Sequence, residues 1–294
     1  MTAKKVFVTG GAGQTGVQAV KWLSKEGRNL DVWAGVKKGD PTQEAIIKTF
    51  SSVHVCTTDA TDLRQLKENF QDVQDLFIVP TSTEDKVQTA CNYIDAAREA
   101  NVKFVLLLSV VGADRDDYSW GTQFQQIERH LKSSGVQSWC IIRTPFYAQN
   151  LLLYKPQIKQ GYLPLPIGDS SITVMDVEDV GKLASTILAD CTPHKNKTYE
   201  VTGAEALSGR QMAEVFTKAL GTEITYKNIT LEEARTILQS MDVPEVEIKG
   251  LLDFYKLAAT QNIWNKPKDD FERLCGEKPK TLHEYLVEKK ALLK

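Results

Sequence analysis

The first half of the chain alternates short apolar runs with longer segments whose apolar residues recur at helical spacing. Short apolar runs between turn residues are typical of buried strands, and the longer periodic segments are typical of helices. The expected strands are Val6 to Val8, Leu30 to Val36, Val53 to Thr57, Leu76 to Val79, Phe104 to Leu108 and Trp139 to Arg143. The expected helices are Gln14 to Glu26, Leu63 to Asn69, Lys86 to Ala100 and Gln123 to Ser133. The alternation predicts an α/β fold with a Rossmann-type doubly wound parallel sheet and helices on both faces.

The pattern changes after residue 145, where prolines and glycines mark an irregular connection. A strand is expected from Ile172 to Val174, a helix from Val177 to Leu188 and a strand from Thr198 to Thr202. Ser208, Thr230 and Thr281 each stand three residues before a Gln or Glu, which predicts capping boxes at three helix starts. We expect a sheet domain over residues 1–150, to which 172–203 returns. A smaller, mostly helical substrate or lid domain is expected over 151–171 and 204–294.

Three glycines, Gly10, Gly13 and Gly16, separate the first expected strand from the first expected helix. A glycine-rich turn in this position lets the backbone approach a pyrophosphate, and the helix N-terminus offers free N–H groups to it. The spacing differs from the usual G-x-G-x-x-G fingerprint, and a tight turn that binds nothing is the competing interpretation. We interpret the segment as the binding site of a dinucleotide.

Lys37 and Lys38 end the second expected strand, where an NAD-specific protein usually carries an acidic residue. An ammonium group there attracts a 2′-phosphate, so the sequence favours NADP(H) over NAD(H), unless both are ordinary surface lysines. Asp59, after the third strand, is placed to accept a hydrogen bond from the adenine amino group, and an exposed turn aspartate is the competing interpretation.

Ligands of parallel sheets bind beyond the carboxyl ends of the strands. We therefore expect a set of residues that follow these strands to meet at one edge and to bind the cofactor: Thr9, Lys37, Asp59, Thr81, Ser109 and Phe146. The chemistry of the protein is expected at this edge.

Composition excludes several classes of function. The net charge of −2, with no long basic run, gives no case for nucleic-acid binding. Five scattered cysteines and four dispersed histidines offer no metal-ligand spacing, so we expect no metal. We also expect no signal peptide and no membrane-spanning segment, and hence a cytoplasmic protein.

The chain resembles the NmrA-like branch of atypical short-chain dehydrogenases, which includes type-2 quinone oxidoreductases, triphenylmethane reductases and NADP-sensing regulators. The similarity rests on residues 8–16, 107–113, 142–150 and 175–181 and on Glu128, Leu131, Ser134 and Gly135. It implies that the turn residues Gly10, Gly13, Gln14, Thr15 and Gly16 hold the pyrophosphate and that Lys37 holds the 2′-phosphate. It further implies that Phe146 lies by the nicotinamide, and Tyr147 and Asn150 by the substrate.

One departure from related enzymes bears on the chemistry. Ordinary short-chain dehydrogenases use a Tyr-x-x-x-Lys pair, whose lysine lowers the pKa of the tyrosine so that the phenol can move a proton. No such pair occurs here in the right context, and Phe124 aligns with the lysine that isoflavone reductase-like members use. Phe124 cannot move a proton. We therefore favour hydride transfer to an acceptor that needs little help with protonation, such as a quinone, because its conjugated system spreads the incoming charge.

Several residues are candidates for positions beside that acceptor. Ser109 could hydrogen-bond an acceptor oxygen or only cap a turn, and Tyr147 is a second catalytic candidate. Aromatic residues could form a slot for a planar substrate or could simply pack, which is their commoner role. The residues expected on the substrate side are Tyr118, Phe124, Tyr147 and Asn150, with Trp120 and Phe146 beside them.

Three functions remain open on the sequence. The leading hypothesis is an NADPH-dependent reductase of a small planar acceptor. The rival is a non-catalytic regulator that senses NADP(H) and binds a protein partner, and Phe124 is the residue that supports it. A third is a reductase of a specialised metabolite, with the proton supplied by Tyr118 or Tyr147.

Overall fold

The computed structural model describes residues 3–25 and 29–293. Its internal contacts divide the chain into two compact units. The first unit comprises residues 1–113, 123–143 and 180–200, and the second comprises 114–122, 144–179 and 201–294. We describe each unit by itself.

A seven-stranded sheet forms the centre of the first unit, in the order β10-β6-β5-β4-β1-β2-β3. The register pairs β1 with β2 and β4, β2 with β3, β4 with β5, and β6 with β10, each in parallel. The side chains of β4 and most of β5 are buried, as strands covered on both faces should be. The strands are β1 (Lys4–Val8), β2 (Leu30–Lys37), β3 (Val53–Thr58), β4 (Asp75–Ile78), β5 (Phe104–Val110), β6 (Trp139–Thr144) and β10 (Lys197–Glu200).

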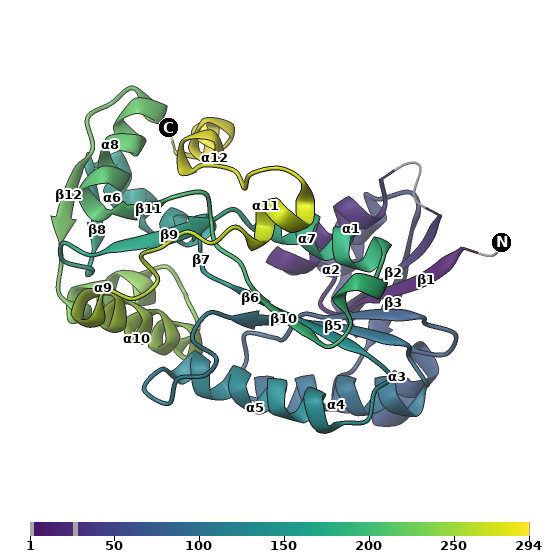
Figure 1. The fold of residues 1–294 in the computed structure, drawn as a ribbon. Helices are drawn as coiled ribbons and strands as arrows, with labels where there is room; N and C mark the ends of the chain where they lie inside the picture. The colour runs from purple at the N-terminus through teal and green to yellow at the C-terminus, as the bar shows by residue number, and fades with distance from the viewer. Residues whose placement is uncertain (1–2, 26–28, 294) are drawn as a thin grey trace. The chain divides into compact units, whose positions relative to one another are not determined.

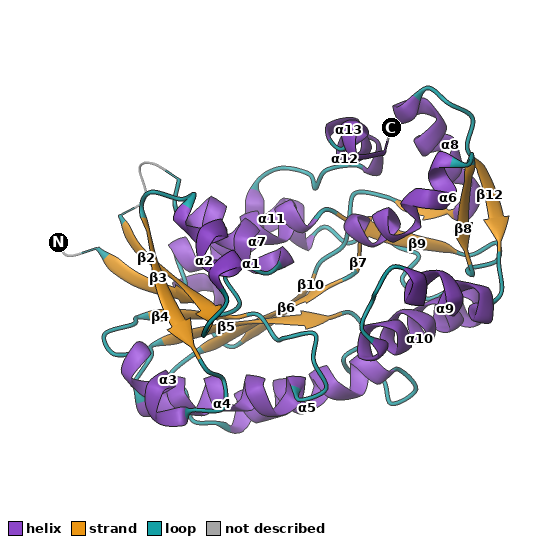
Figure 2. Ribbon diagram, turned by 180° about the vertical axis from the view of Figure 1, so that it is seen from behind, coloured by secondary structure: helices purple, strands orange, loops and turns teal. Residues whose placement is uncertain are grey.

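Helices cover both faces of this sheet. Figures 1 and 2 show α3, α4 and α5 on one face and α1, α2 and α7 on the other. Their bounds are α1 (Gln14–Leu23), α2 (Pro41–Lys48), α3 (Leu63–Asn69), α4 (Lys86–Glu99), α5 (Ser119–Ser133) and α7 (Val177–Ala189), with a 3-10 turn, η2 (Thr192–His194), before β10. The expected doubly wound parallel sheet is confirmed. Glu26, the expected end of the first helix, lies outside the described residues.

The second unit contains two small sheets. One has the order β11-β9-β7 and the other joins β12 to β8. Its strands are β7 (Phe146–Tyr147), β8 (Tyr162–Leu165), β9 (Ser171–Met175), β11 (Ala206–Ser208) and β12 (Thr225–Asn228). The expected strand around residues 172–174 is therefore present, and it pairs with β7 and β11, whereas β10 pairs with β6 of the large sheet.

Helices make up most of the rest of the second unit, as expected for the C-terminal part. They are η1 (Ala148–Tyr154), α6 (Lys155–Lys159), α8 (Gly209–Leu220), α9 (Leu231–Ser240), α10 (Glu245–Gln261), α11 (Asp270–Cys275), α12 (Leu282–Glu288) and α13 (Lys290–Leu293). All three predicted capping boxes are confirmed: Ser208, Thr230 and Thr281 each cap a helix whose third residue returns a side-chain bond to the cap. Among the described helices, none is long and apolar enough to cross a membrane.

The turn that leads into α7 gathers an unusual density of buried charge. Asp176 caps the helix by accepting from the Glu178 N–H at 3.0 Å, and the Lys280 ammonium lies 3.0 Å from the other Asp176 oxygen. Asp179, one turn further along, accepts from the backbone N–H of Lys280 at 2.8 Å. Burial, together with the negative charges of Asp176 and Glu178, raises the pKa of Asp179 to about 6. Asp179 therefore favours its neutral form more in the folded than in the unfolded protein.

We expect Asp179→Asn to stabilise the protein at neutral pH. Because the pKa of Asp179 is higher in the folded state, the protein loses stability as the pH rises through about 6. A neutral amide should recover about 1–3 kcal/mol of unfolding free energy at pH 8 and retain the acceptor for Lys280. The gain should shrink as the pH falls from 6 towards 4. Denaturant unfolding at several pH values measures both effects.

The control is Asp169→Asn, because the side chain of Asp169 is 93% exposed. It should change the unfolding free energy by less than ~0.5 kcal/mol at every pH. A gain for Asp179→Asn that did not depend on pH would contradict the explanation by ionisation.

Candidate functional site

The turn after β1 is built by close backbone contact. A Cβ on Gly16 would overlap the carbonyl oxygen of Gly10, so α1 can begin this close to the turn only with glycine at position 16. Gly10 itself has a φ of +56°, in the left-handed region that favours glycine. The Gly13 N–H bonds back to the Gly10 carbonyl at 2.9 Å, and the Gly11 N–H bonds to Gly35 of β2 at 2.8 Å. The turn is thus held against the sheet by its own backbone.

The N-terminus of α1 has no side-chain cap. Gly13 is the N-cap residue and has no side chain to donate or accept, and the first helical bond runs from the Val17 N–H to the Gly13 carbonyl. Gln14, Thr15 and Gly16 lie between these two residues, and Gln14 is exposed. Their N–H groups precede the first helical bond at the positive end of the helix dipole, an arrangement suited to an anion such as a pyrophosphate.

The carboxyl end of β2 is positively charged and well ordered by hydrogen bonds. Lys37 and Lys38 are both exposed there. The Lys37 N–H donates to Oε1 of Gln43 at 2.9 Å, and Asp40 caps α2 by accepting from the Thr42 and Gln43 N–H groups. The carboxylate of Asp40 is therefore engaged with the helix, and two ammonium groups mark the place where a ribose 2′-substituent lies in proteins of this fold.

Asp59 forms a tight turn after β3. One carboxylate oxygen accepts from the hydroxyl of Thr61 at 2.6 Å and from its N–H at 2.9 Å. These two hydrogen bonds, helped by the charge of Lys38, lower the pKa of Asp59. Asp59 is thus placed at the expected edge as a carboxylate. Its role toward an adenine remains a prediction, because the bonds to Thr61 also fit the turn interpretation.

Thr9 and Thr81 follow β1 and β4. Thr9 is fully buried, and its hydroxyl accepts from the Val79 N–H at 2.9 Å, which joins the ends of the two strands. The Thr81 hydroxyl lies 2.7 Å from that of Thr83, in the loop before α4. Thr9 therefore joins the ends of β1 and β4, and Thr81 stays a predicted cofactor contact.

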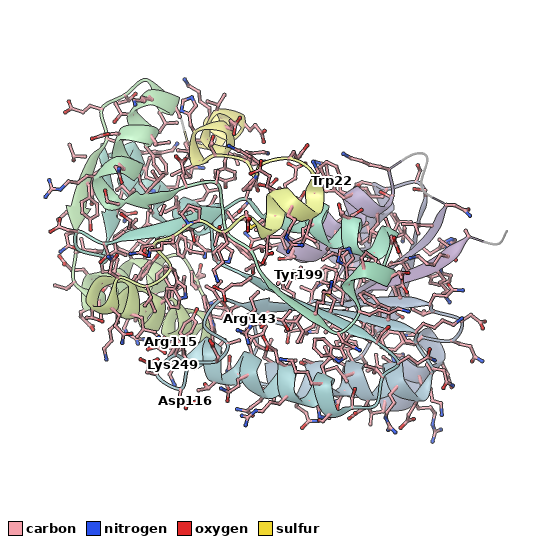
Figure 3. The ribbon with its side chains drawn as sticks, in the orientation of Figure 1. Trp22, Arg115, Asp116, Arg143, Tyr199 and Lys249 are labelled. Atoms are coloured by element: carbon pink, nitrogen blue, oxygen red, sulfur yellow. The ribbon has the colours of Figure 1, made fainter. Side chains whose placement is uncertain are left out.

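Ser109, at the end of β5, belongs to a buried polar network with Glu128 of α5 and Arg143 of β6. The Ser109 hydroxyl donates to Glu128 at 2.7 Å, and Arg143, labelled in Figure 3, donates to both oxygens of Glu128 at 2.9 and 2.8 Å. The Ser109 proton is thus directed at Glu128. To donate to an acceptor oxygen, the predicted catalytic Ser109 would have to give up that bond, whereas accepting a hydrogen bond requires no such change.

Glu128 stays ionised although its side chain is only 3% exposed. Burial acts to raise its pKa, but hydrogen bonds from Arg143 and Ser109 and the charge of Arg143 outweigh burial and hold the pKa below its usual value. Lys132 adds a weaker ion pair at 3.4 Å. Glu128 stands four residues after Phe124 on α5, and it is one of the residues on which the resemblance to the NmrA-like family rests.

Phe124 is buried, with 6% of its surface exposed. The Lys86 ammonium, from the first residue of α4, lies 5.3 Å from the centroid of its ring, within the range of a cation–π contact. Phe124, which aligns with the lysine of isoflavone reductase-like members, therefore has the Lys86 ammonium of α4 over its ring. No simple sequence pattern could have indicated this pairing.

Four rings of the second unit form an aromatic stack, which we define as Tyr118, Phe146, Phe254 and Trp264. Phe254 stacks on Phe146 at 5.2 Å and on Trp264 at 4.6 Å, and Tyr118 contacts Trp264 at 5.5 Å. Burial and the charges of Asp253 and Glu247 raise the pKa of Tyr118 well above its usual value. Tyr118 is therefore a poor proton donor near neutral pH.

The remaining predicted substrate residues follow β6. The Tyr147 hydroxyl lies 2.9 Å from that of Thr144, and its side chain is partly exposed. Asn150 is partly exposed in η1. Trp120 packs against α10 at Gly250, where a Cβ would overlap the indole. The roles of Tyr147 and Asn150 toward a substrate remain predictions.

The fold and the glycine turn together define a class of protein, the Rossmann-type α/β proteins with a nucleotide-binding βαβ unit. Within that class the family is established by a match of residues 2–286 to the NmrA-like family. The chain belongs to the NmrA-like family, as its sequence motifs predicted.

Several known proteins are similar to this chain over most of its length. The NAD(P)H azoreductase of Xenophilus azovorans is 29% identical over 255 residues, covering 86% of this chain and 87% of that protein. The NADPH-dependent quinone oxidoreductase of Escherichia coli, crystallised with NADPH, superimposes with a TM-score of 0.85 at 24% identity, covering 96% of this chain and 99% of that one. The triphenylmethane reductase of Citrobacter sp., crystallised with NADP(H), gives a TM-score of 0.85 at 20% identity, covering 97% and 99%. The two structural matches establish the fold.

We expect Glu128→Gln to destabilise the protein by about 3 kcal/mol, because it leaves the largely buried Arg143 guanidinium without its counter-charge. Lys132→Gln is the matched control. It removes a positive charge beside the same carboxylate, but the Lys132 side chain is 40% exposed, so the cost should stay below ~1 kcal/mol. Denaturant unfolding of the two variants compares them directly. Equal small losses would mean that the buried pair with Arg143 is not the dominant interaction.

Proposed function

We propose that this protein is a reductase that transfers hydride from NADPH to a planar conjugated acceptor, such as a quinone or an azo dye. The observation that carries the proposal is the glycine turn that brings the uncapped N-terminus of α1 against the end of β1. The absence of a proton-moving pair on α5, where Phe124 and Glu128 stand, supports an acceptor that needs little acid catalysis. The names of similar proteins, an NAD(P)H azoreductase and a quinone oxidoreductase, agree with this acceptor class.

The residues present fit a dinucleotide. A Cβ at Gly11 would come within 2.7 Å of the Ala34 side chain, and one at Gly16 would overlap Gly10, so the turn can pack this closely between β2 and α1 only with glycine at both positions. The turn and the helix N-terminus would hold the pyrophosphate, and Lys37 and Lys38 would hold a 2′-phosphate. When bound, reduced NADP supplies a hydride, which is two electrons and one proton.

The chain's own residues would bind and orient the cofactor and the acceptor, and they would exclude water from the site. The aromatic stack, through Phe146, would give the nicotinamide an apolar neighbour. Glu128 holds the hydroxyl of Ser109 in one orientation, which favours acceptance of a hydrogen bond from a bound group. A quinone that receives the hydride becomes a hydroquinone anion, and it takes its second proton from water. No protein acid is then required, which agrees with Phe124 on α5 and with the raised pKa of Tyr118.

The test is the oxidation of NADPH in the presence of acceptors. Purified protein mixed with NADPH and a panel of quinones and azo dyes should lose absorbance at the wavelength of the reduced nicotinamide, at a rate that depends on the acceptor. If no acceptor in the panel accelerates this loss, the proposal of a reductase is wrong.

The same experiment bears on the alternative, a non-catalytic regulator that senses NADP(H) and binds a protein partner. Phe124, buried where isoflavone reductase-like members carry a lysine, is the residue that favours it. Tight binding of NADPH without turnover would support the regulator. Turnover with any of these acceptors would count against it.

Lys37→Glu should weaken the binding of NADPH by roughly 10- to 100-fold, because it replaces a charge-assisted contact to the 2′-phosphate with a repulsive charge. NADH lacks that phosphate, so its dissociation constant should change by less than about threefold. Titration calorimetry with each nucleotide measures the two constants. Lys48→Glu, a similar charge reversal on the exposed side of α2, is the control and should leave both nearly unchanged. Equal losses of affinity for NADPH and NADH in Lys37→Glu would show that Lys37 does not bind the 2′-phosphate.

A further inference from the structure

Gln149 stands between Tyr147 and Asn150, the two predicted substrate residues that follow β6. The main-chain pairing of this segment is short, because β7 ends at Tyr147, opposite Met175 of β9 (Figure 1). The chain then enters the 3-10 helix η1. Beyond the end of the strand, side-chain contacts must hold the segment in place.

The amide of Gln149 makes such a contact by binding the turn before α7 through both of its polar atoms. Nε2 donates to Oδ1 of Asp176 at 2.6 Å, and Oε1 accepts from the Val177 N–H at 3.2 Å. The same Asp176 oxygen accepts from the Glu178 N–H at 3.0 Å, and Asp176 is only 3% exposed. Because this carboxylate is buried and fixed at the start of α7, it gives Gln149 a rigid partner.

Lys280, from the segment before α12, holds the other oxygen of that carboxylate. Its ammonium lies 3.0 Å from Oδ2 of Asp176, and it also pairs with Glu288 at 2.7 Å and with Glu178 at 3.4 Å. The Lys280 side chain is 17% exposed, so its pair with Asp176 is largely shielded from water. Without the ammonium, the buried carboxylate would lack its counter-charge and would be drawn toward water, away from Gln149.

We propose that Gln149 is a positioning residue for the acceptor, because its bonds to the turn before α7 fix the segment that carries Tyr147 and Asn150. Lys280, from the C-terminal part of the chain, completes this arrangement through Asp176. The inference rests on the proposed function and adds residues that do not touch the acceptor themselves. A segment ordered before binding lowers the entropic cost of holding the acceptor. Loss of these contacts should therefore weaken acceptor binding and leave the phosphate contacts of the first unit unchanged.

The test measures the binding of an acceptor apart from turnover. Menadione, a naphthoquinone, is titrated by calorimetry into the purified protein saturated with NADP⁺, which carries no hydride to transfer. Gln149→Met keeps the length of the side chain but removes both hydrogen bonds, and it should weaken menadione binding roughly three- to tenfold. The dissociation constant of NADP⁺, titrated separately, should change by less than about twofold, because its phosphate contacts share no partner with Gln149.

Variants of Lys280 test the second step of the arrangement. Lys280→Met should also weaken menadione binding, by no more than Gln149→Met does, whereas Lys280→Arg keeps a positive charge near Asp176 and should retain an affinity close to that of the natural protein. The double variant of Gln149→Met and Lys280→Met should bind menadione about as well as Gln149→Met alone, because the effect of Lys280 reaches the acceptor through Gln149. Two residues that merely stabilise the fold would not show this non-additivity.

Gln160→Met and Lys278→Met are the matched controls. Gln160 and Lys278 are exposed residues of the same unit, and each receives the same substitution as the residue it controls. Both should leave menadione affinity unchanged. If Lys280→Met fails to fold because three carboxylates lose their shared ammonium, Gln149→Met and its control still decide the inference.

The outcomes separate this inference from the function on which it rests. Menadione affinity that is unchanged in Gln149→Met would overturn the inference, even if the natural protein reduces quinones. Equal losses of affinity for menadione and NADP⁺ would assign Gln149 a general structural role and overturn it as well. Additive losses in the double variant would overturn the part of Lys280. Weaker menadione binding in Gln149→Met, in a protein that oxidises no NADPH, would instead support the positioning role and reject the reductase.

Discussion

The carbonyl oxygen of Gly10 stands where a side chain at position 16 would begin, and much of the first unit follows from that contact. Because Gly16 has no Cβ, α1 can start directly against the turn after β1. The dipole of the helix and its unbonded N–H groups then point to the carboxyl edge of the sheet, near the ends of β2 and β4. The Gly11 N–H bond to Gly35 fixes the turn to β2, so the distance from the turn to Lys37 is set by backbone geometry.

A second constraint acts at the ends of β5 and β6. Ser109, Glu128 and Arg143 come from three elements, and a buried ion pair of this kind is costly unless every member is satisfied. Because every member is satisfied, the network fixes the two strand ends to α5. It also directs the hydroxyl proton of Ser109 toward Glu128. The sequence placed Ser109 at the correct edge, but only the position of Glu128 in space shows the direction of its hydrogen bond.

Strands of the first unit were predictable because burial on both faces leaves a nearly continuous apolar run, as in β5. Helix α2 was not predicted, although Asp40 and Pro41 are ordinary start signals, because only Ile47 of its eight residues is fully buried and the apolar period is weak. The short strands of the second unit, such as β8 and β12, pair residues about 60 positions apart. Their pairing is a tertiary choice that local patterns do not encode. Trp264 escaped prediction for the same reason, since its partners Phe254, Tyr118 and Thr173 meet only in the fold.

The three capping boxes at Ser208, Thr230 and Thr281 share one property that bears on how far the connecting loops can change. Each specifies the start of a helix within four consecutive residues, by bonds that need nothing from the rest of the chain. Connections between these helices can lengthen, shorten or change composition while the helices still begin at the same residues. A part of the protein built in this way tolerates changes in its loops, because the start of each helix is specified locally.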